Sequence, residues 1–306
     1  MVNKFKGVGV ALVTPFHENK SIDYDSLQKL IDYVIQNQVD YVVSLGTTGE
    51  GSTLSLEERY NILDFTAQIV ANRVPIVAGF SSNNTQKVLK EISGYHFNKI
   101  DAILSATPHY NRPNQAGIYQ HFDAIAQESP LPILLYNVPS RTASAIAAST
   151  TLKLMHKHPN IVGIKDASND IASITCVLKE KREGFVVLSG DDLHTLPLLA
   201  CGAEGVISVV ANVLPREFSA LVNFAMLGRY DKSRHFHYLL ANLIDLLFAD
   251  GSPGGIKAAL NLIGICKEEL RLPLTAINET IKTNIGLEIE KIRTQNTTKY
   301  TSFTYN

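Results

Sequence analysis

Eight short apolar runs recur along the first 228 residues of this chain, and amphipathic segments separate them. The runs are GVGVALV (7–13), YVVSL (41–45), VPIVAG (74–79), DAILSA (101–106), PILLYN (132–137), IVGIK (161–165), FVVLSG (185–190) and GVISV (205–209). Almost every position within a run is apolar, whereas a strand with one face in water would alternate. The runs are therefore typical of parallel β-strands covered on both faces, and few folds provide such strands.

The segments between the runs have the period of α-helices. In residues 23–36, apolar side chains recur three and four positions apart and so share one face. Residues 55–70 open with Ser55 and Glu58, which have the spacing of a capping box. Further segments of this kind lie at 84–97, 114–128, 144–157, 170–181, 192–201 and 215–227.

Eight strand–helix units within roughly 225 residues predict an α/β protein with a (β/α)8 TIM barrel. The rival is a doubly wound sheet, but the first run is not followed by the GxGxxG turn typical of its dinucleotide-binding form. Residues beyond the barrel show helical patterns only. We therefore expect a barrel over 1–228, a C-terminal helical appendage over 229–294 and a polar tail over 295–306.

Composition excludes several classes of protein. The net charge of −1 over 306 residues lacks the basic excess of nucleic-acid binders. No apolar run approaches the roughly 18 residues that a membrane span needs. The cysteines, Cys176, Cys201 and Cys266, are far apart and form no CxxC pair, so we expect free thiols in a reducing compartment. These features predict a cytoplasmic protein that binds neither nucleic acid nor membrane.

A lysine, Lys165, ends the sixth apolar run. In a barrel of this kind the active site lies at the carboxyl ends of the strands. An amine held against an apolar wall loses hydration, which favours its neutral form, and a neutral amine attacks a carbonyl to form a Schiff base. The alternative is a lysine whose ammonium simply reaches solvent at the strand end.

Other strand ends carry further candidates. Tyr136 lies near the end of the fifth run, and its phenol is suited to proton transfer. The turn GTTGEG (46–51) offers backbone N–H groups and two hydroxyls, which suit a small anion. Arg141 can bind a carboxylate with two parallel hydrogen bonds. Each also has a plain interpretation: a packed tyrosine, an ordinary turn and a surface arginine.

Five segments together resemble one known family in their order and spacing. They look like the dihydrodipicolinate synthase and N-acetylneuraminate lyase family of pyruvate-dependent class I aldolases, over about residues 7–290. The segments are GTTGE (46–50), PHYNRP (108–113), YNVPSRT (136–142), GIKDAS (163–168) and SGDD (189–192).

The resemblance implies catalytic roles for four residues. Lys165 would form the Schiff base with pyruvate, and Tyr136 would donate and accept protons. Thr47 and Tyr110 would complete a proton relay with Tyr136. The residue that matches Tyr110 reaches into the neighbouring subunit's site in this family. A homodimer is therefore implied, commonly paired again into a tetramer.

The resemblance also implies how substrates are held. Thr48 and Ile207 would hold pyruvate through backbone contacts, and Arg141 would meet the carboxylate of the second substrate at the entrance. No metal and no organic cofactor would be needed, because the iminium itself accepts electrons. The implied small-molecule substrates are pyruvate and L-aspartate 4-semialdehyde. Their condensation would give 4-hydroxy-tetrahydrodipicolinate, the entry to diaminopimelate and lysine.

Three alternatives stay open at this point. Another pyruvate aldolase of the family would act on sialic acid or a 2-keto-3-deoxy sugar acid, although sialate lyases generally lack the arginine that matches Arg141. A metal-dependent aldolase or hydrolase is disfavoured, because the histidines of HKH (156–158) and HFH (235–237) fall in helical segments. A barrel kept as a binding protein would be expected to lose Lys165 or Tyr136.

One region departs from the family. Members that lysine inhibits often carry two histidines after GTTGE, then an asparagine with a glutamate. The positions here are Leu56, Arg59, Asn83 and Lys87, and His109 stands where a tyrosine is common. Leucine cannot hydrogen-bond a ligand, and Lys87 would repel a lysine ammonium. We predict weak or absent inhibition by lysine. A lysine titration of initial rates tests this, and strong inhibition at low lysine concentration would contradict it.

Overall fold

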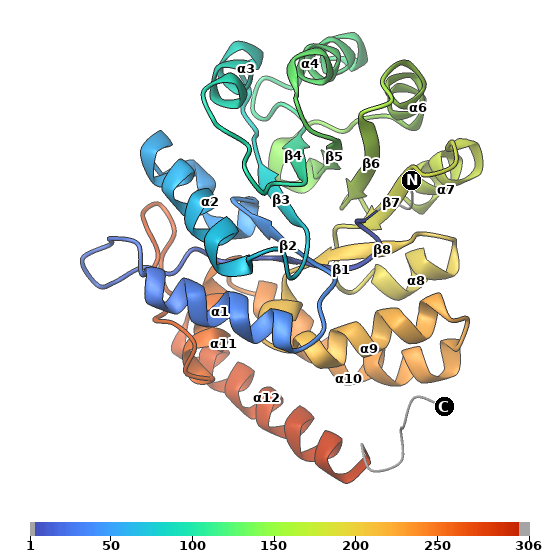
Figure 1. Cartoon of the computed structure of the whole chain (residues 1–306). Coiled ribbons are helices and arrows are strands. Elements are labelled where there is room, and N and C mark those ends of the chain that lie inside the picture. The colour runs from blue at the N-terminus through green and yellow to red at the C-terminus, as the bar shows by residue number, and fades with distance from the viewer. Residues whose placement is uncertain (1–3, 300–306) are drawn as a thin grey trace.

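The computed structural model describes residues 4–299, and within them eight parallel strands form a closed barrel (Figure 1). Each strand pairs with its neighbour in sequence, and β1 closes the barrel on β8. The strands are β1 (Gly7–Ala11), β2 (Tyr41–Ser44), β3 (Ile76–Gly79), β4 (Ala102–Ala106), β5 (Ile133–Asn137), β6 (Ile161–Asp166), β7 (Val186–Ser189) and β8 (Gly205–Ser208). Each predicted run overlaps one of these strands, so the predicted (β/α)8 fold is confirmed.

Helices surround the barrel, with at least one after each strand (Figure 1). They are α1 (Tyr24–Gln36), α2 (Leu56–Val70), α3 (Thr85–Ser93), α4 (Gln115–Glu128), α6 (Ala148–Lys157), α7 (Ile171–Glu180), α8 (Thr195–Ala200) and α9 (Pro215–Met226). The predicted capping box is confirmed, because Ser55 and Glu58 each accept a hydrogen bond from the other's backbone N–H. The four-residue helix α5 (Pro139–Thr142), between β5 and α6, was not predicted.

The barrel interior is filled by side chains. Tyr41 is fully buried there, and its hydroxyl donates to the carbonyl of Val206 at 3.2 Å. Gly9 makes room for this ring, since a Cβ at that position would lie 2.1 Å from it. Phe5, Tyr41 and Leu104 belong to this inner cluster, and a larger outer cluster lies between the strands and the helices. Because the interior is packed, the space for a ligand lies at the mouth of the barrel.

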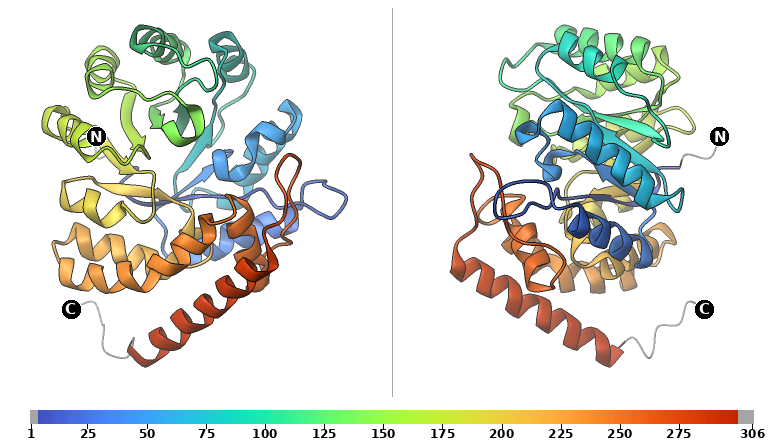
Figure 2. Two further views of the ribbon diagram at one scale, coloured as in Figure 1. Left: turned by 180° about the vertical axis from the view of Figure 1, so that it is seen from behind. Right: turned by 60° about the vertical axis from the view of Figure 1, so that its left-hand side comes forward.

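The chain beyond the barrel folds as α10 (Tyr230–Phe248), α11 (Gly254–Leu262) and α12 (Glu279–Lys299). α10 packs against α9, and α12 lies across α10 and α11 (Figure 2). Residues 295–299 of the predicted polar tail belong to α12, and 300–306 lie outside the described residues. The division of the chain at residue 228 stays a prediction. No helix within residues 4–299 is both long and apolar enough to cross a bilayer.

Candidate active site

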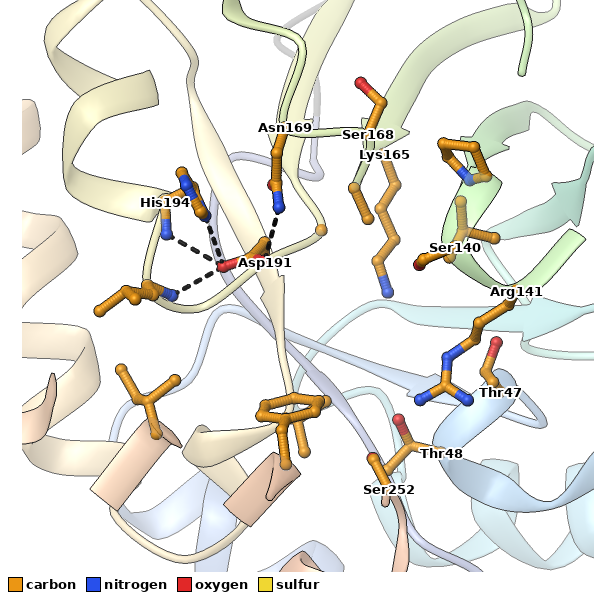
Figure 3. Close-up of a pocket in the computed structure, with 18 of the residues that line it drawn as sticks. Thr47, Thr48, Ser140, Arg141, Lys165, Ser168, Asn169, Asp191, His194 and Ser252 are labelled. Atoms are coloured by element: carbon orange, nitrogen blue, oxygen red, sulfur yellow. Dashed lines mark hydrogen bonds and ion pairs between the residues drawn. The ribbon is translucent and has the colours of Figure 1, made fainter. Parts of the chain in front are cut away.

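A cavity of about 640 Å³ opens at the carboxyl-terminal mouth of the barrel (Figure 3). Its size is in the range usual for sites that bind small molecules. Five of the predicted site residues line it: Thr47, Thr48, Tyr136, Arg141 and Lys165. The structure therefore brings together, at one cavity, side chains from β5, β6, α5 and the turn after β2.

Lys165 and Tyr136 are neighbours across the β5–β6 pairing. Both are buried, with 5% and 6% of their surface exposed, and the Lys165 Nζ lies 4.3 Å from the centre of the Tyr136 ring. Among the residues that the structure describes, no carboxylate forms an ion pair with Lys165. A buried lysine with no counter-ion favours the interpretation as a reactive amine over that of a lysine reaching solvent.

The strand ends around Lys165 hold its side chain in one direction. Gly190 leaves room for it, because a Cβ there would lie 3.0 Å from Lys165 Cε and 2.7 Å from Ala167 Cβ. The Asp166 carbonyl accepts from Gly190 N at 2.7 Å, and its carboxylate accepts from Asn137 Nδ2 at 2.9 Å. These bonds join the ends of β5, β6 and β7, so the amine projects into the cavity.

The turn after β2 forms the opposite wall. Thr47–Gly49 make one turn of 3-10 helix, η1, in which Thr48 is buried and Thr47 is exposed. Thr14 anchors the turn by donating its hydroxyl to the Gly49 carbonyl at 2.6 Å. Figure 3 shows Lys165 and Arg141 pointing toward the part of the cavity that Thr47 and Thr48 line. A guanidinium and an amine beside a turn with hydroxyls suit an anionic ligand.

Arg141 owes its place to the short helix α5. The Thr107 hydroxyl donates to the Thr142 hydroxyl at 3.1 Å, and the Ser144 hydroxyl donates to the Pro108 carbonyl at 2.6 Å. These bonds tie α5 to the segment that follows β4. Arg141 itself is exposed and lines the cavity, so its guanidinium is available to a carboxylate.

Asp192, of the SGDD segment, supports the end of β8. Its carboxylate accepts from the backbone N–H groups of Val209 at 3.0 Å and Val210 at 2.9 Å. Burial raises the pKa of Asp192 to about 6, although these hydrogen bonds act in the opposite direction. Val209 lines the cavity, so Asp192 fixes part of the wall without facing it.

Two predicted residues lie outside the cavity of this single chain. Tyr110 is 84% exposed, has a φ of +71° and does not line the cavity. Ile207 is 1% exposed and belongs to the inner cluster, whereas Val209, two residues later, reaches the cavity wall. The roles of Tyr110 and Ile207 stay predictions.

Other lining residues were not predicted as site residues. Asp191 accepts from the backbone of Leu193 and of His194, each at 3.0 Å, and from Asn169 Nδ2 at 3.3 Å (Figure 3). The SGDD segment was the only signal for this part of the wall. The C-terminal region also contributes, through Ile244, Asp245, Phe248, Ala249 and Ser252. Within residues 4–299, no three histidine, cysteine or acidic side chains gather as metal ligands would.

Two of the positions that depart from the lysine-inhibited pattern contact one acidic residue, Glu91. Arg59 is buried and donates to Glu91 Oε2 at 2.7 Å and to the Gly79 carbonyl at 3.3 Å. The exposed Lys87 lies 4.0 Å from the other oxygen of Glu91. Glu91 thus already has two cationic neighbours. Weak inhibition by lysine stays a prediction.

The fold and the site define a (β/α)8 protein with a buried lysine at the mouth of its barrel. The pattern of the Dihydrodipicolinate synthetase family matches residues 4–292. The chain belongs to this family.

Individual relatives match this chain over nearly its whole length. The 4-hydroxy-tetrahydrodipicolinate synthase of Parabacteroides distasonis is 48% identical over 269 residues, which cover 88% of this chain and 91% of the relative. The structure of the enzyme of that name from Methylacidiphilum fumariolicum has a TM-score of 0.93 and 38% identity, and covers 96% of this chain and 98% of its own. A monomeric dihydrodipicolinate synthase variant has a TM-score of 0.92 and 37% identity, and covers 95% and 97%.

Proposed function

We propose that this protein is a 4-hydroxy-tetrahydrodipicolinate synthase, which condenses pyruvate with L-aspartate 4-semialdehyde. The observation that carries the proposal is the Lys165 amine, buried beside Tyr136 at the mouth of the barrel and facing the turn at Thr47 and Thr48. A relative with this name at 48% identity supports the same substrates.

The first half of the reaction activates pyruvate. Lys165 Nζ attacks the keto carbon and forms a C–N bond. The keto oxygen takes up one proton from the attacking amine and one from Tyr136, and leaves as water. The resulting iminium draws electrons from the adjacent methyl carbon, which loses a proton to the Tyr136 phenolate and becomes the carbon nucleophile of an enamine. In the turn, Thr48 holds the pyruvate carboxylate through its backbone N–H, and the Thr47 hydroxyl relays protons to Tyr136.

The second half joins the two substrates. The enamine carbon attacks the aldehyde carbon of the semialdehyde, and the aldehyde oxygen takes up a proton from Tyr136. The amino group of the semialdehyde then attacks the iminium carbon and closes the ring. It passes one proton to the leaving Lys165 nitrogen and the other to the Tyr136 phenolate, so both groups return to their starting state. Arg141 orients the semialdehyde by its carboxylate.

Arg141→Ala tests the choice of second substrate. We expect the KM for L-aspartate 4-semialdehyde to rise about 10- to 100-fold, because a charge-assisted hydrogen bond contributes about 1.5–3 kcal/mol. The KM for pyruvate should stay nearly constant. The measurement is steady-state kinetics with each substrate varied in turn. Arg234→Ala, an exposed arginine on α10 that does not line the cavity, is the control.

A comparison of acceptors with the purified protein completes this test. We expect the semialdehyde to give the highest kcat/KM. Faster turnover of sialic acid or of a 2-keto-3-deoxy sugar acid would instead assign the chain to another aldolase of the family. An unchanged semialdehyde KM in Arg141→Ala would remove Arg141 from the site.

We also propose a homodimer, paired into a tetramer, located in the cytoplasm. Tyr110 supports the dimer, because it is 84% exposed in this chain and the residue that matches it in the family reaches into the neighbouring subunit's site. A related structure is that of a monomeric variant, so the assembly needs direct measurement. Sedimentation velocity across a range of protein concentrations measures it. The free thiols of Cys176, Cys201 and Cys266 support the reducing compartment.

A further inference from the structure

A fully buried ion pair lies behind the turn that faces Lys165. The Lys257 ammonium donates to Glu50 Oε1, and neither side chain has exposed surface. Lys257 also donates to the Glu269 carbonyl at 2.7 Å and lies 4.2 Å from the centre of the Phe16 ring. Burial lowers the pKa of Lys257, and the Glu50 carboxylate opposes this effect. Neither residue of the pair lines the cavity.

The pair joins two segments that do line it. Glu50 directly follows η1, has a φ of +53° and donates its backbone N–H to the Thr47 carbonyl at 3.2 Å. Lys257 lies in α11, five residues after Ser252, which is part of the cavity wall. The Glu50 carboxylate therefore connects the substrate-facing turn to the start of α11.

The pair of Glu50 and Lys257 is not needed merely to attach the C-terminal region to the barrel. Arg271 already joins the segment between α11 and α12 to α2, because it contacts both carboxylate oxygens of Glu58, at 2.6 and 2.8 Å. It also donates to the Lys20 carbonyl at 2.7 Å, and Figure 1 places this segment beside α2. The backbone N–H of Arg271 also reaches the turn, since it donates to Glu50 Oε2 at 3.2 Å. Lys257 adds a charged side chain to the same carboxylate, through Glu50 Oε1. Buried charges carry a large desolvation penalty, and apolar side chains often replace such pairs without loss of stability.

We propose that Glu50 and Lys257 are positioning residues. They fix the turn of Thr47 and Thr48 in the position from which it binds the carboxylate of pyruvate while Lys165 attacks the keto carbon. The C-terminal helices thus take part in substrate binding through α11. This inference rests on the proposed function.

Glu50→Gln tests the inference, because it removes the charge and keeps the shape. We expect the KM for pyruvate to rise about tenfold or more, since small displacements of positioning groups have large effects. The KM for the semialdehyde should change little. At low pyruvate concentration, reduction with borohydride should trap less adduct than in the wild-type protein. At saturating pyruvate it should trap the wild-type amount. A variant that was only less stable would not raise the KM for pyruvate while leaving the KM for the semialdehyde unchanged.

Glu91→Gln is the matched control. It breaks the buried pair of Arg59 and Glu91, joined at 2.7 Å, which does not touch the cavity. We expect it to lower the melting temperature and leave the pyruvate KM unchanged. The double variant Glu50→Gln/Lys257→Gln leaves no unpaired buried charge, and we expect it to fold and to show the raised pyruvate KM.

Two outcomes would overturn the inference. One is a wild-type pyruvate KM in Glu50→Gln or in the double variant. The other is a pyruvate KM that rises as much in Glu91→Gln as it does in Glu50→Gln. Failure of the proposed function is recognised separately, because the wild-type protein would then form no borohydride-reducible adduct with pyruvate.

Discussion

Lys165→Arg is expected to abolish turnover and the covalent adduct with pyruvate. Arginine keeps the positive charge and most of the length of the side chain, but its guanidinium does not act as a neutral amine nucleophile. Loss of a covalent nucleophile lowers kcat by at least about 10³-fold, with larger losses on record. The residual rate would come from the Thr47–Thr48 turn and from Tyr136, which still bind and polarise the substrate.

The adduct gives a more direct measurement than the rate. Wild-type protein reduced with borohydride in the presence of pyruvate should carry one modification, and peptide mass spectrometry should place it on Lys165. Lys153→Arg, at an exposed position on α6, is the control and should behave as wild type. An adduct on another lysine, or normal turnover in Lys165→Arg, would refute the assignment of the nucleophile.

The barrel could be predicted from the sequence because burial on two faces leaves a local pattern. Parallel strands covered on both sides are apolar at nearly every position, and the helices between them repeat apolar residues every three or four positions. The short helix α5 escaped prediction, because four residues beginning with Pro139 are too few to show a period. The end of α12 escaped as well, since residues 295–299 lack an apolar face.

The site was predictable where a residue's place follows from its strand. Lys165 and Tyr136 lie one residue before the ends of adjacent strands, so their pairing followed from the order of the runs. Contacts between distant segments leave no such signal. Glu50 and Lys257 are 207 positions apart, and nothing near Phe248 or Ser252 indicated that they line the cavity. A role for Tyr110 in a partner's site cannot be derived from one chain alone.

Tyr136→Phe is expected to lower kcat by about 10²- to 10⁴-fold, the usual contribution of a group that transfers protons. The change removes one hydroxyl and keeps the ring, whose centre lies 4.3 Å from Lys165 Nζ, so the surroundings of the amine stay as they are. The amine still forms the Schiff base, only more slowly. Long incubation with pyruvate and borohydride should therefore label Lys165 fully, whereas short incubation should not.

The control for Tyr136→Phe is Tyr41→Phe. Tyr41 is the other buried tyrosine of the inner cluster, and its hydroxyl donates to the Val206 carbonyl at 3.2 Å, away from the cavity. Its loss should reduce stability by about 1 kcal/mol and leave kcat unchanged. The two variants differ only in where the hydroxyl is removed. If Tyr136→Phe labelled as fast as wild type and kept its kcat, proton transfer would have to pass through another group, and the exposed Thr47 hydroxyl at the cavity would be the first to examine.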